Sequence, residues 1–169
     1  EGWQSLAGEG GHVDFAPVDD TDVVIWKALR DQHGRVSAEQ LLSGRGLVQI
    51  YTALAEYEGG NPQYSEPSDI TTHGLSGDCS ICLAALNQFC AVMGSFAGNL
   101  ALNLGTNGGV YISGGIVPRF LSFFENSKFR ERFEAKGRFK SYLREIPTFV
   151  IESRISPALS GASHALDLA

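Results

Sequence analysis

The sequence predicts an α/β domain rich in helices, and three consecutive segments carry this prediction. Apolar residues recur at three- and four-residue steps over residues 78–104, which indicates a helix about 40 Å long. A β-branched and aromatic run at residues 110–112 indicates a buried strand. The pair Gly114-Gly115 then precedes Pro118, a residue that tolerates the first turn of a helix. Such a corner is either an ordinary βα turn or a place where bare backbone and a helix N-terminus approach a ligand.

Composition favours a single globular domain. The chain has 169 residues, 43% of them hydrophobic and 19% charged, which is ordinary for a folded protein with a substantial core. A net charge of −6 argues against a nucleic-acid surface. We find no apolar run near the length of a membrane span, no signal-like start, and an odd number of cysteines, three. We therefore expect a cytoplasmic protein that binds neither nucleic acid nor a membrane.

The first part of the chain places charged groups among glycines. Residues 3–6 alternate like the end of a strand, and residues 8–12 follow with the sequence GEGGH. Because glycine lets the backbone bend sharply, Glu9 and His12 can lie on one side of this turn. The alternative is a hairpin turn whose polar side chains only face water.

Two helix starts follow. Asp19 or Thr21 can cap a helix that runs to about Arg30, with Gly34 just beyond its end. Residues 37–40 read SAEQ, a capping box that places Glu39 in the first turn of the next helix. An acidic residue there either stabilises the helix through its dipole or takes part in a site.

The remaining elements are assigned from periodicity and turn residues. Residues 46–57 indicate another helix, and residues 58–69, which hold glycines and prolines, indicate an exposed and mobile loop. Gly94 and Gly98 lie four apart on the long helix and would let another backbone pack closely against it. Beyond the strand we expect short helices at 117–124, 126–133 and 139–144, a β-rich run at 146–151, and a turn into a final helix at 157–166.

Several site types can be weighed from their motifs. Cys79, Cys82, Cys90 and His73 contain one CxxC pair but no second pair at a zinc-binding distance, so we expect core or surface thiols. The sequence contains no GxxxxGK[ST], GxSxG or HExxH motif. Glu9, His12 and Asp14 have the composition of a hydrolytic site, but no nucleophile or metal accompanies them.

Four motifs occur in a fixed order along the chain: GEGGHVDFAP at 8–17, SAEQLLSG at 37–44, NLALNL at 99–104 and GGIVPRF at 114–120. Together they resemble the C-terminal half of a bacterial-type glucokinase, of the hexokinase–actin ATPase superfamily. The resemblance implies a helix-rich portion of a ribonuclease H-like (actin-like ATPase) large lobe at residues 1–156. Residues 157–169 would form a C-terminal helix that returns to a smaller lobe.

The resemblance also implies a function. Members phosphorylate the 6-hydroxyl of glucose with ATP and Mg²⁺, and the matching sugar-binding positions are Glu9, His12 and Glu39. The adenosine side of the nucleotide is implied at Gly114, Gly115 and Ile116. The family further suggests a homodimer. Zinc-binding relatives carry a cysteine cluster soon after the histidine of the GEGGH segment, and here none occurs before Cys79, so we expect no structural metal.

Parts of the family pattern are not found in this sequence. The DxGGTN phosphate loop, the aspartate that takes the proton from the sugar, and a second glycine-rich phosphate loop are expected upstream of Glu1. No residue of this chain is therefore assigned as catalytic, and we expect the chain by itself not to turn over glucose. The alternatives are a sugar-binding or regulatory remnant without kinase activity, and a kinase for another hexose such as mannose or a hexosamine.

Overall fold

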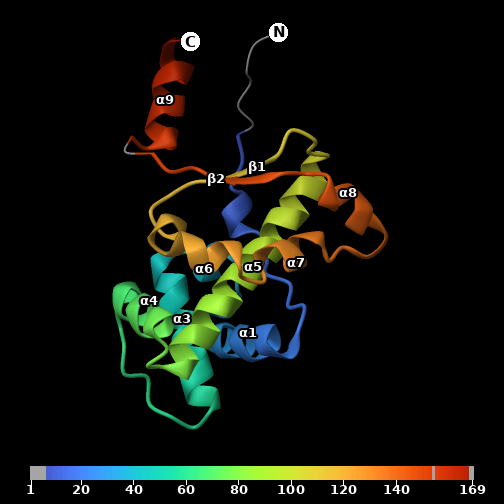
Figure 1. Cartoon of the computed structure of the whole chain (residues 1–169). Helices are drawn as coiled ribbons and strands as arrows, with labels where there is room; N and C mark the ends of the chain where they lie inside the picture. Colours follow the sequence, from blue (N-terminus) through green and yellow to red (C-terminus); the bar gives the residue numbers. More distant parts are fainter. Residues whose placement is uncertain (1–6, 154, 168–169) are drawn as a thin grey trace. The chain divides into compact units, whose positions relative to one another are not determined.

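The computed structural model describes residues 7–153 and 155–167, and the predicted strand end at residues 3–6 lies outside them (Figure 1). The chain forms two compact units, residues 1–92 and 93–169. Helices dominate both units, and a two-stranded parallel sheet lies in the second. The prediction of a helix-rich α/β chain is confirmed.

The first unit is helical. Helix α3 contacts both α1 and α4, so it lies between them (Figure 1). The core of the first unit is formed by fully buried aliphatic and aromatic side chains, among them Ile25, Leu47 and Phe89. The elements are η1 (Gly10–His12), α1 (Asp20–His33), α2 (Ala38–Leu41), α3 (Gly44–Tyr57), α4 (Pro67–Ser76) and the first part of α5 (Ser80–Leu104).

Side-chain caps fix where the helices of this unit begin. The Asp19 carboxylate accepts a hydrogen bond from the Asp22 backbone N–H at 2.8 Å, so Asp19 rather than Thr21 caps α1. Helix α1 runs beyond Arg30 to His33 and ends at Gly34, whose φ of 79° requires a glycine-like backbone. The capping box is complete, because the Ser37 hydroxyl accepts from the Gln40 N–H and the Gln40 amide oxygen accepts from the Ser37 N–H.

One helix of this unit was not expected from the sequence. The exposed loop is confirmed up to residue 66, but the chain enters α4 at Pro67, inside the range assigned to the loop. Proline suits this first helical position because the N–H that it lacks would have no partner in the helix. Ile70 then anchors α4 by complete burial. Residues 58–69 contain two prolines and two glycines, a composition typical of a loop, and the sequence therefore did not indicate this helix start.

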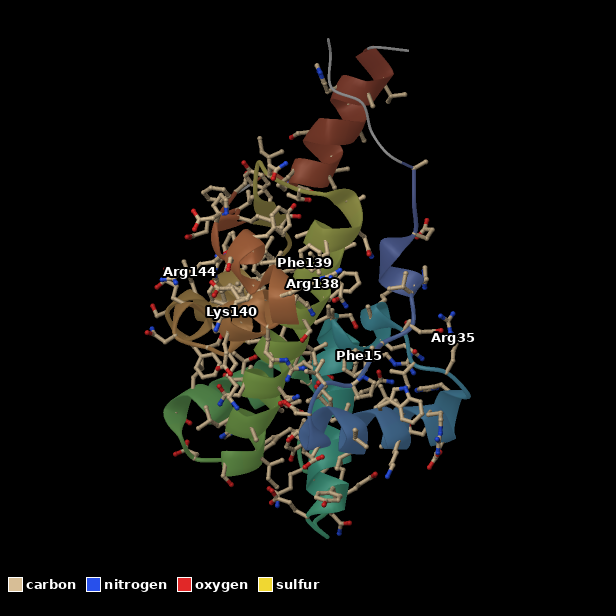
Figure 2. The ribbon with its side chains drawn as sticks, turned by 90° about the vertical axis from the view of Figure 1, so that its right-hand side faces the viewer. Phe15, Arg35, Arg138, Phe139, Lys140 and Arg144 are labelled. Carbon is tan, nitrogen blue, oxygen red and sulfur yellow. The ribbon has the colours of Figure 1, made fainter. Side chains whose placement is uncertain are left out.

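The second unit contains the small sheet. Strands β1 and β2 pair in parallel, with Val110 opposite Thr148, Tyr111 opposite Phe149 and Ile112 opposite Val150. The elements that follow the end of α5 are β1 (Val110–Ile112), η2 (Val117–Phe120), α6 (Leu121–Glu125), α7 (Phe129–Glu134), η3 (Gly137–Phe139), α8 (Lys140–Arg144), β2 (Thr148–Val150) and α9 (Pro157–Asp167). The η3–α8 segment carries exposed Arg138, Phe139, Lys140 and Arg144 (Figure 2).

Two expectations about this unit are corrected. Strand β1 forms as predicted but is not buried: Tyr111 is 61% exposed and stacks on Phe149 with ring centroids 5.0 Å apart. Phe149 is 44% exposed as well, so this stacked pair of rings lies at the surface. The helix expected from 117 begins as a 3₁₀ turn before α6, and the helix expected from 126 begins only at Phe129.

The close approach expected at the glycines of α5 is confirmed. A side chain at Gly94 would overlap the carbonyl of Phe129, and one at Gly98 would lie 2.5 Å from the carbonyl oxygen of Phe133. Helix α7 therefore runs against the glycine face of α5. The buried Arg132 Nε donates to the Ser95 hydroxyl at 2.9 Å across the same contact.

Helix α5 also corrects the expectation about membrane-length runs. Its 25 residues and a mean hydropathy of 1.5 over an 18-residue window are sufficient, by length and composition, for a membrane span. However, 67% of that window is buried inside the fold, which is typical of the core helix of a soluble protein.

Candidate functional site

The glycine-rich segment folds back onto the start of α2. Residues 10–12 form the 3₁₀ turn η1, in which the His12 N–H donates to the Glu9 carbonyl at 3.0 Å. The following residues then pair with the strand-like segment before α2. The Phe15 N–H donates to the Val36 carbonyl at 2.9 Å, and the Ala38 N–H donates to the Val13 carbonyl at 3.1 Å. This pairing brings η1 beside the first turn of α2.

The three side chains implied for sugar binding meet around one imidazole nitrogen. His12 Nε2 lies 3.2 Å from Glu39 Oε2 and 3.9 Å from Glu9 Oε2. The side chains are 60% exposed for His12, 58% for Glu39 and 87% for Glu9. The structure therefore brings two carboxylates and one imidazole together at the surface, with atoms free to meet a polar ligand.

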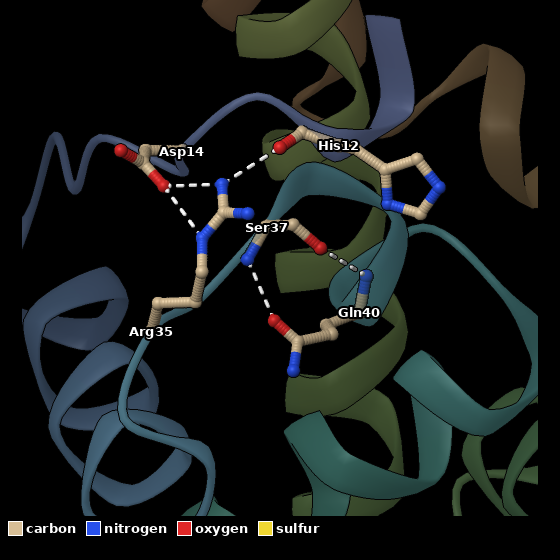
Figure 3. Close-up of polar contacts among 5 residues, drawn as sticks. All are labelled: His12, Asp14, Arg35, Ser37 and Gln40. Atoms are coloured by element: carbon tan, nitrogen blue, oxygen red, sulfur yellow. Dashed lines mark hydrogen bonds and ion pairs between the residues drawn. The ribbon is translucent and has the colours of Figure 1, made fainter. Parts of the chain in front are cut away.

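A fourth side chain, which the sequence did not single out, joins this group. The Arg35 guanidinium donates through Nε and Nη2 to Asp14 Oδ1 at 3.0 and 2.6 Å, and through Nη2 to the His12 carbonyl at 2.7 Å (Figure 3). Arg35 lies 21 residues from Asp14, so no local pattern could have joined them. Asp14 pairs with Arg35 and so does not join Glu9 and His12 in the hydrolytic site that these three residue types could compose.

A polar hollow of about 460 Å³ adjoins the group. His12, Arg35 and Glu39 line it together with side chains from the end of α1 and the start of α3. Within it, Gln49 Nε2 lies 3.1 Å from His33 Nε2, and the Gln49 amide oxygen is buried with no hydrogen-bond partner among the residues that the structure describes. Carboxylates accept hydrogen bonds from adjacent hydroxyls, and imidazole can donate or accept, so the surface suits a polyhydroxylated molecule.

Two of the three cysteines lie in the core and the third lies at its edge. Cys82 and Cys90 are buried and Cys79 is half-buried, and the Cys82 N–H donates to Cys79 Sγ at 3.2 Å. Burial raises the pKa of the Cys82 thiol to about 12, with a further contribution from Cys79. The His73 ring stacks on Tyr64 at 4.5 Å. Of the two expected placements, core or surface, Cys82 and Cys90 take the core and Cys79 lies partly exposed.

A second cavity lies in the second unit, at the glycine corner after β1. Gly114, at a φ of 112°, and Gly115 form part of its wall, and a Cβ added at either would meet no described residue within 4 Å. The cavity measures about 700 Å³ and is completed by residues 151–153 and the start of α9. Ile116 does not line it but precedes η2 as the N-cap residue. Because η2 is one short 3₁₀ turn, the corner offers bare backbone rather than a long helix N-terminus.

Comparison with known proteins places the chain in a family. A family model described as Glucokinase matches residues 1–169. The glucokinase of Neisseria meningitidis is 51% identical over 166 residues, covering 98% of this chain and 50% of the relative. The glucokinase of Cronobacter sakazakii is 54% identical over 160 residues, covering 95% of this chain and 50% of the relative. The chain thus spans about half the length of these relatives.

The solved structures that the chain resembles are also glucokinases. The crystal structure of glucokinase from an Antarctic psychrotroph matches with a TM-score of 0.87 and 39% identity, over 97% of this chain and 51% of that one. The glucokinase of Balamuthia mandrillaris in complex with glucose matches with a TM-score of 0.73 at 18% identity, over 91% of this chain and 45% of that one, which shows likeness of fold. The chain belongs to the bacterial-type glucokinase family.

Proposed function

We propose that the protein containing this chain transfers a phosphoryl group from ATP to the 6-hydroxyl of glucose. The observation that carries the proposal is the convergence of Glu9, His12 and Glu39 around one imidazole nitrogen, in a chain of the glucokinase family. In this proposal the chain supplies the sugar site and the nucleoside side of the ATP site. Residues 1–156 would form a helix-rich portion of a ribonuclease H-like large lobe, and residues 157–169 a C-terminal helix that returns to a smaller lobe.

The sugar site works through directed hydrogen bonds. An ionised carboxylate has several lone pairs and can accept from two neighbouring sugar hydroxyls at once, a role suited to Glu39 and Glu9. His12 adds a donor or an acceptor beside Glu39, at the same edge of the hollow. Hydrogen bonds to charged acceptors are stronger than neutral ones, and they hold the sugar in one orientation.

The nucleotide side is proposed at the cavity of the second unit. Gly114 and Gly115 leave bare backbone there, so a flat base or a ribose can approach closely. Glu152, Ser153 and Ser156 line the same cavity and can hydrogen-bond to amino or hydroxyl groups. Among its described lining residues there is no Lys or Arg, so it suits the nucleoside better than the phosphates. ATP with Mg²⁺ would supply the phosphoryl group, and Ile116 would hold the turn.

The remaining catalytic parts are proposed to come from outside this chain. Phosphoryl transfer depends on positioned phosphates and on a base for the attacking hydroxyl. Closure of two lobes over the sugar would then exclude water and limit ATP hydrolysis. We further propose that the protein is cytoplasmic and forms a homodimer. Light scattering of the purified protein measures its mass and so tests the dimer.

The sugar site is tested by calorimetric titration of glucose against the longer protein that contains this chain and against its Glu39→Gln variant. Hydrogen bonds to charged groups contribute about 1.5–3 kcal/mol, so we expect glucose affinity to fall about 10- to 100-fold. The fold should persist, because the capping box uses Ser37 and Gln40 rather than Glu39. Glu56→Gln, on the exposed side of α3, is the matched control and should bind as the parent does. Unchanged affinity in Glu39→Gln would remove Glu39 from the site.

Two further measurements separate the alternatives. Competition between glucose, mannose and a hexosamine for the same site identifies the preferred hexose. Glucose 6-phosphate formation, followed with ATP and Mg²⁺, is expected to be absent for the 169-residue chain by itself. Measurable turnover by this chain would contradict that expectation, and glucose binding without turnover in the longer protein would favour a sugar-binding or regulatory role.

A further inference from the structure

The His12 turn is held in place by few contacts of its own. In the part of the chain that the structure describes, η1 is a single 3₁₀ turn with no buried residue, and its N-cap residue Glu9 makes no side-chain capping bond. His12 and Glu39 are both more than half exposed, so packing against other side chains holds them only in part. The backbone that carries them therefore has a large share in setting the geometry of their contact.

Two devices connect the η1 backbone to the segment before α2. The first is the strand-like pairing of residues 13–15 with residues 36–38, which includes an isolated bridge between Asp14 and Ser37. The second is the Arg35 side chain, which extends from the segment before α2 to Asp14 and to the backbone of His12 (Figure 3). Its Nη2 atom donates to the carbonyl of His12 itself, and the same guanidinium is fixed by Asp14.

We propose that Arg35 is a positioning residue for the sugar site. By holding the His12 carbonyl and the Asp14 carboxylate together, it fixes the direction in which the imidazole leaves the turn and so keeps Nε2 against Glu39. The inference rests on the proposed function, in which His12 and Glu39 bind the sugar.

Arginine chemistry explains why this residue type suits the role. A guanidinium is planar and presents several N–H groups in a fixed fork, so it can serve a carboxylate and a carbonyl simultaneously. A lysine ammonium is a single flexible point charge that reproduces only part of this arrangement. Arg35 is 59% exposed, and exposed ion pairs add little to stability, so its effect should fall on placement rather than on folding.

The test compares three variants of the longer protein that contains this chain, which is the parent. Arg35→Gln removes the fork, Arg35→Lys keeps only the charge, and Arg30→Gln removes an exposed arginine that pairs with its neighbour Asp31. Calorimetry measures glucose affinity. We expect about a fivefold loss for Arg35→Gln, equivalent to about 1 kcal/mol, a smaller loss for Arg35→Lys, and none for Arg30→Gln. Thermal unfolding midpoints of Arg35→Gln and Arg30→Gln should be similar.

A second readout does not require sugar. Nuclear Overhauser contacts between the His12 ring and the Glu39 side chain should be present in the parent and in Arg30→Gln, and weakened in Arg35→Gln. If the parent fails to bind glucose, the proposed function is wrong, while these contacts still decide the role of Arg35. Their retention in Arg35→Gln overturns the inference.

A double-mutant cycle separates positioning from general damage. If Arg35 acts through the His12–Glu39 pair, the losses in glucose affinity caused by Arg35→Gln and Glu39→Gln should be non-additive. Strict additivity would overturn the inference. Should Arg35→Gln fail to fold, Asp14→Asn provides the same comparison, because it weakens the anchor of the guanidinium while leaving Arg35 present. Unchanged affinity and unchanged ring contacts in Asp14→Asn would likewise contradict the role.

Discussion

Replacing Gly94 by alanine should destabilise the second unit through a collision between helices. A Cβ atom at Gly94 would overlap the Phe129 carbonyl of α7, which cannot turn aside as a flexible side chain would. The neighbouring Gly98 shows the scale: a Cβ there lies 2.5 Å from the Phe133 carbonyl oxygen, about 0.9 Å short of ordinary contact at 3.4 Å. Helix α7 must therefore move away from α5 by about an ångström and lose packing along its length.

The expected magnitude is a balance of two terms. Overpacking a well-filled contact costs about 1–3 kcal/mol, and the backbone obstacle puts Gly94→Ala at the upper end. The better helix propensity of alanine returns about 1 kcal/mol. We therefore expect a net loss of about 2 kcal/mol in the free energy of unfolding. Urea denaturation followed by circular dichroism measures it, and hydrogen exchange of α7 shows where the loss falls.

A matched control tests the same substitution without the obstacle. Gly161 lies within α9, where an added Cβ would meet none of the described residues within 4 Å and no positive φ opposes it. Gly161→Ala should therefore stabilise α9 by up to about 1 kcal/mol, seen as slower hydrogen exchange there. The reasoning is refuted if Gly94→Ala is as stable as the parent, or if Gly161→Ala is destabilised to the same extent.

Three other predictions concern the first unit. Ser37→Ala removes one bond of the capping box and should cost about 1 kcal/mol in urea denaturation, whereas the exposed Ser68→Ala should cost little. In thiol labelling of the native chain, Cys79 should react well before the buried Cys82 and Cys90, and equal rates would contradict their burial. Because the pKa of Cys82 is about 12 in the folded chain against 9.0 as the reference, the folded state keeps a proton that the unfolded state loses. The stabilisation associated with this proton is present below pH 9 and is lost as the pH rises above it, and Cys82→Ala should flatten the stability curve in that range.

Local rules were sufficient where a few adjacent residues determine the structure. The Ser37 capping box, the Gly34 helix end and the small-residue face at Gly94 and Gly98 each depend on a short stretch of sequence, and each is confirmed. The start of α4 at Pro67 was missed because a proline after a glycine-rich loop indicates a continued loop as readily as a first helical turn.

Some residues of the candidate site could be identified from the sequence, and others could not. The family resemblance identified Glu9, His12 and Glu39, and the structure brings them together, while their role in sugar binding stays a prediction. Arg35 could not be found from the sequence, because its partners lie 21 and 23 residues earlier and meet it only after residues 13–15 pair with residues 36–38. The exposure of Tyr111 could not be predicted either, because a β-branched and aromatic run has the same composition in a covered and in an uncovered strand.

The pairing of residues 13–15 with residues 36–38 has a consequence for how the sugar site assembles. All of its proposed side chains lie within residues 9–39, so closing the site requires only the loop that contains α1. Short loops cost little chain entropy, and contacts of low sequence separation form rapidly. Helix α1 thus acts as a spacer of fixed length between the two halves of the site. Adding one residue within it would turn its end by about 100° and lead Arg35 away from Asp14, so α1 should tolerate substitutions far better than insertions.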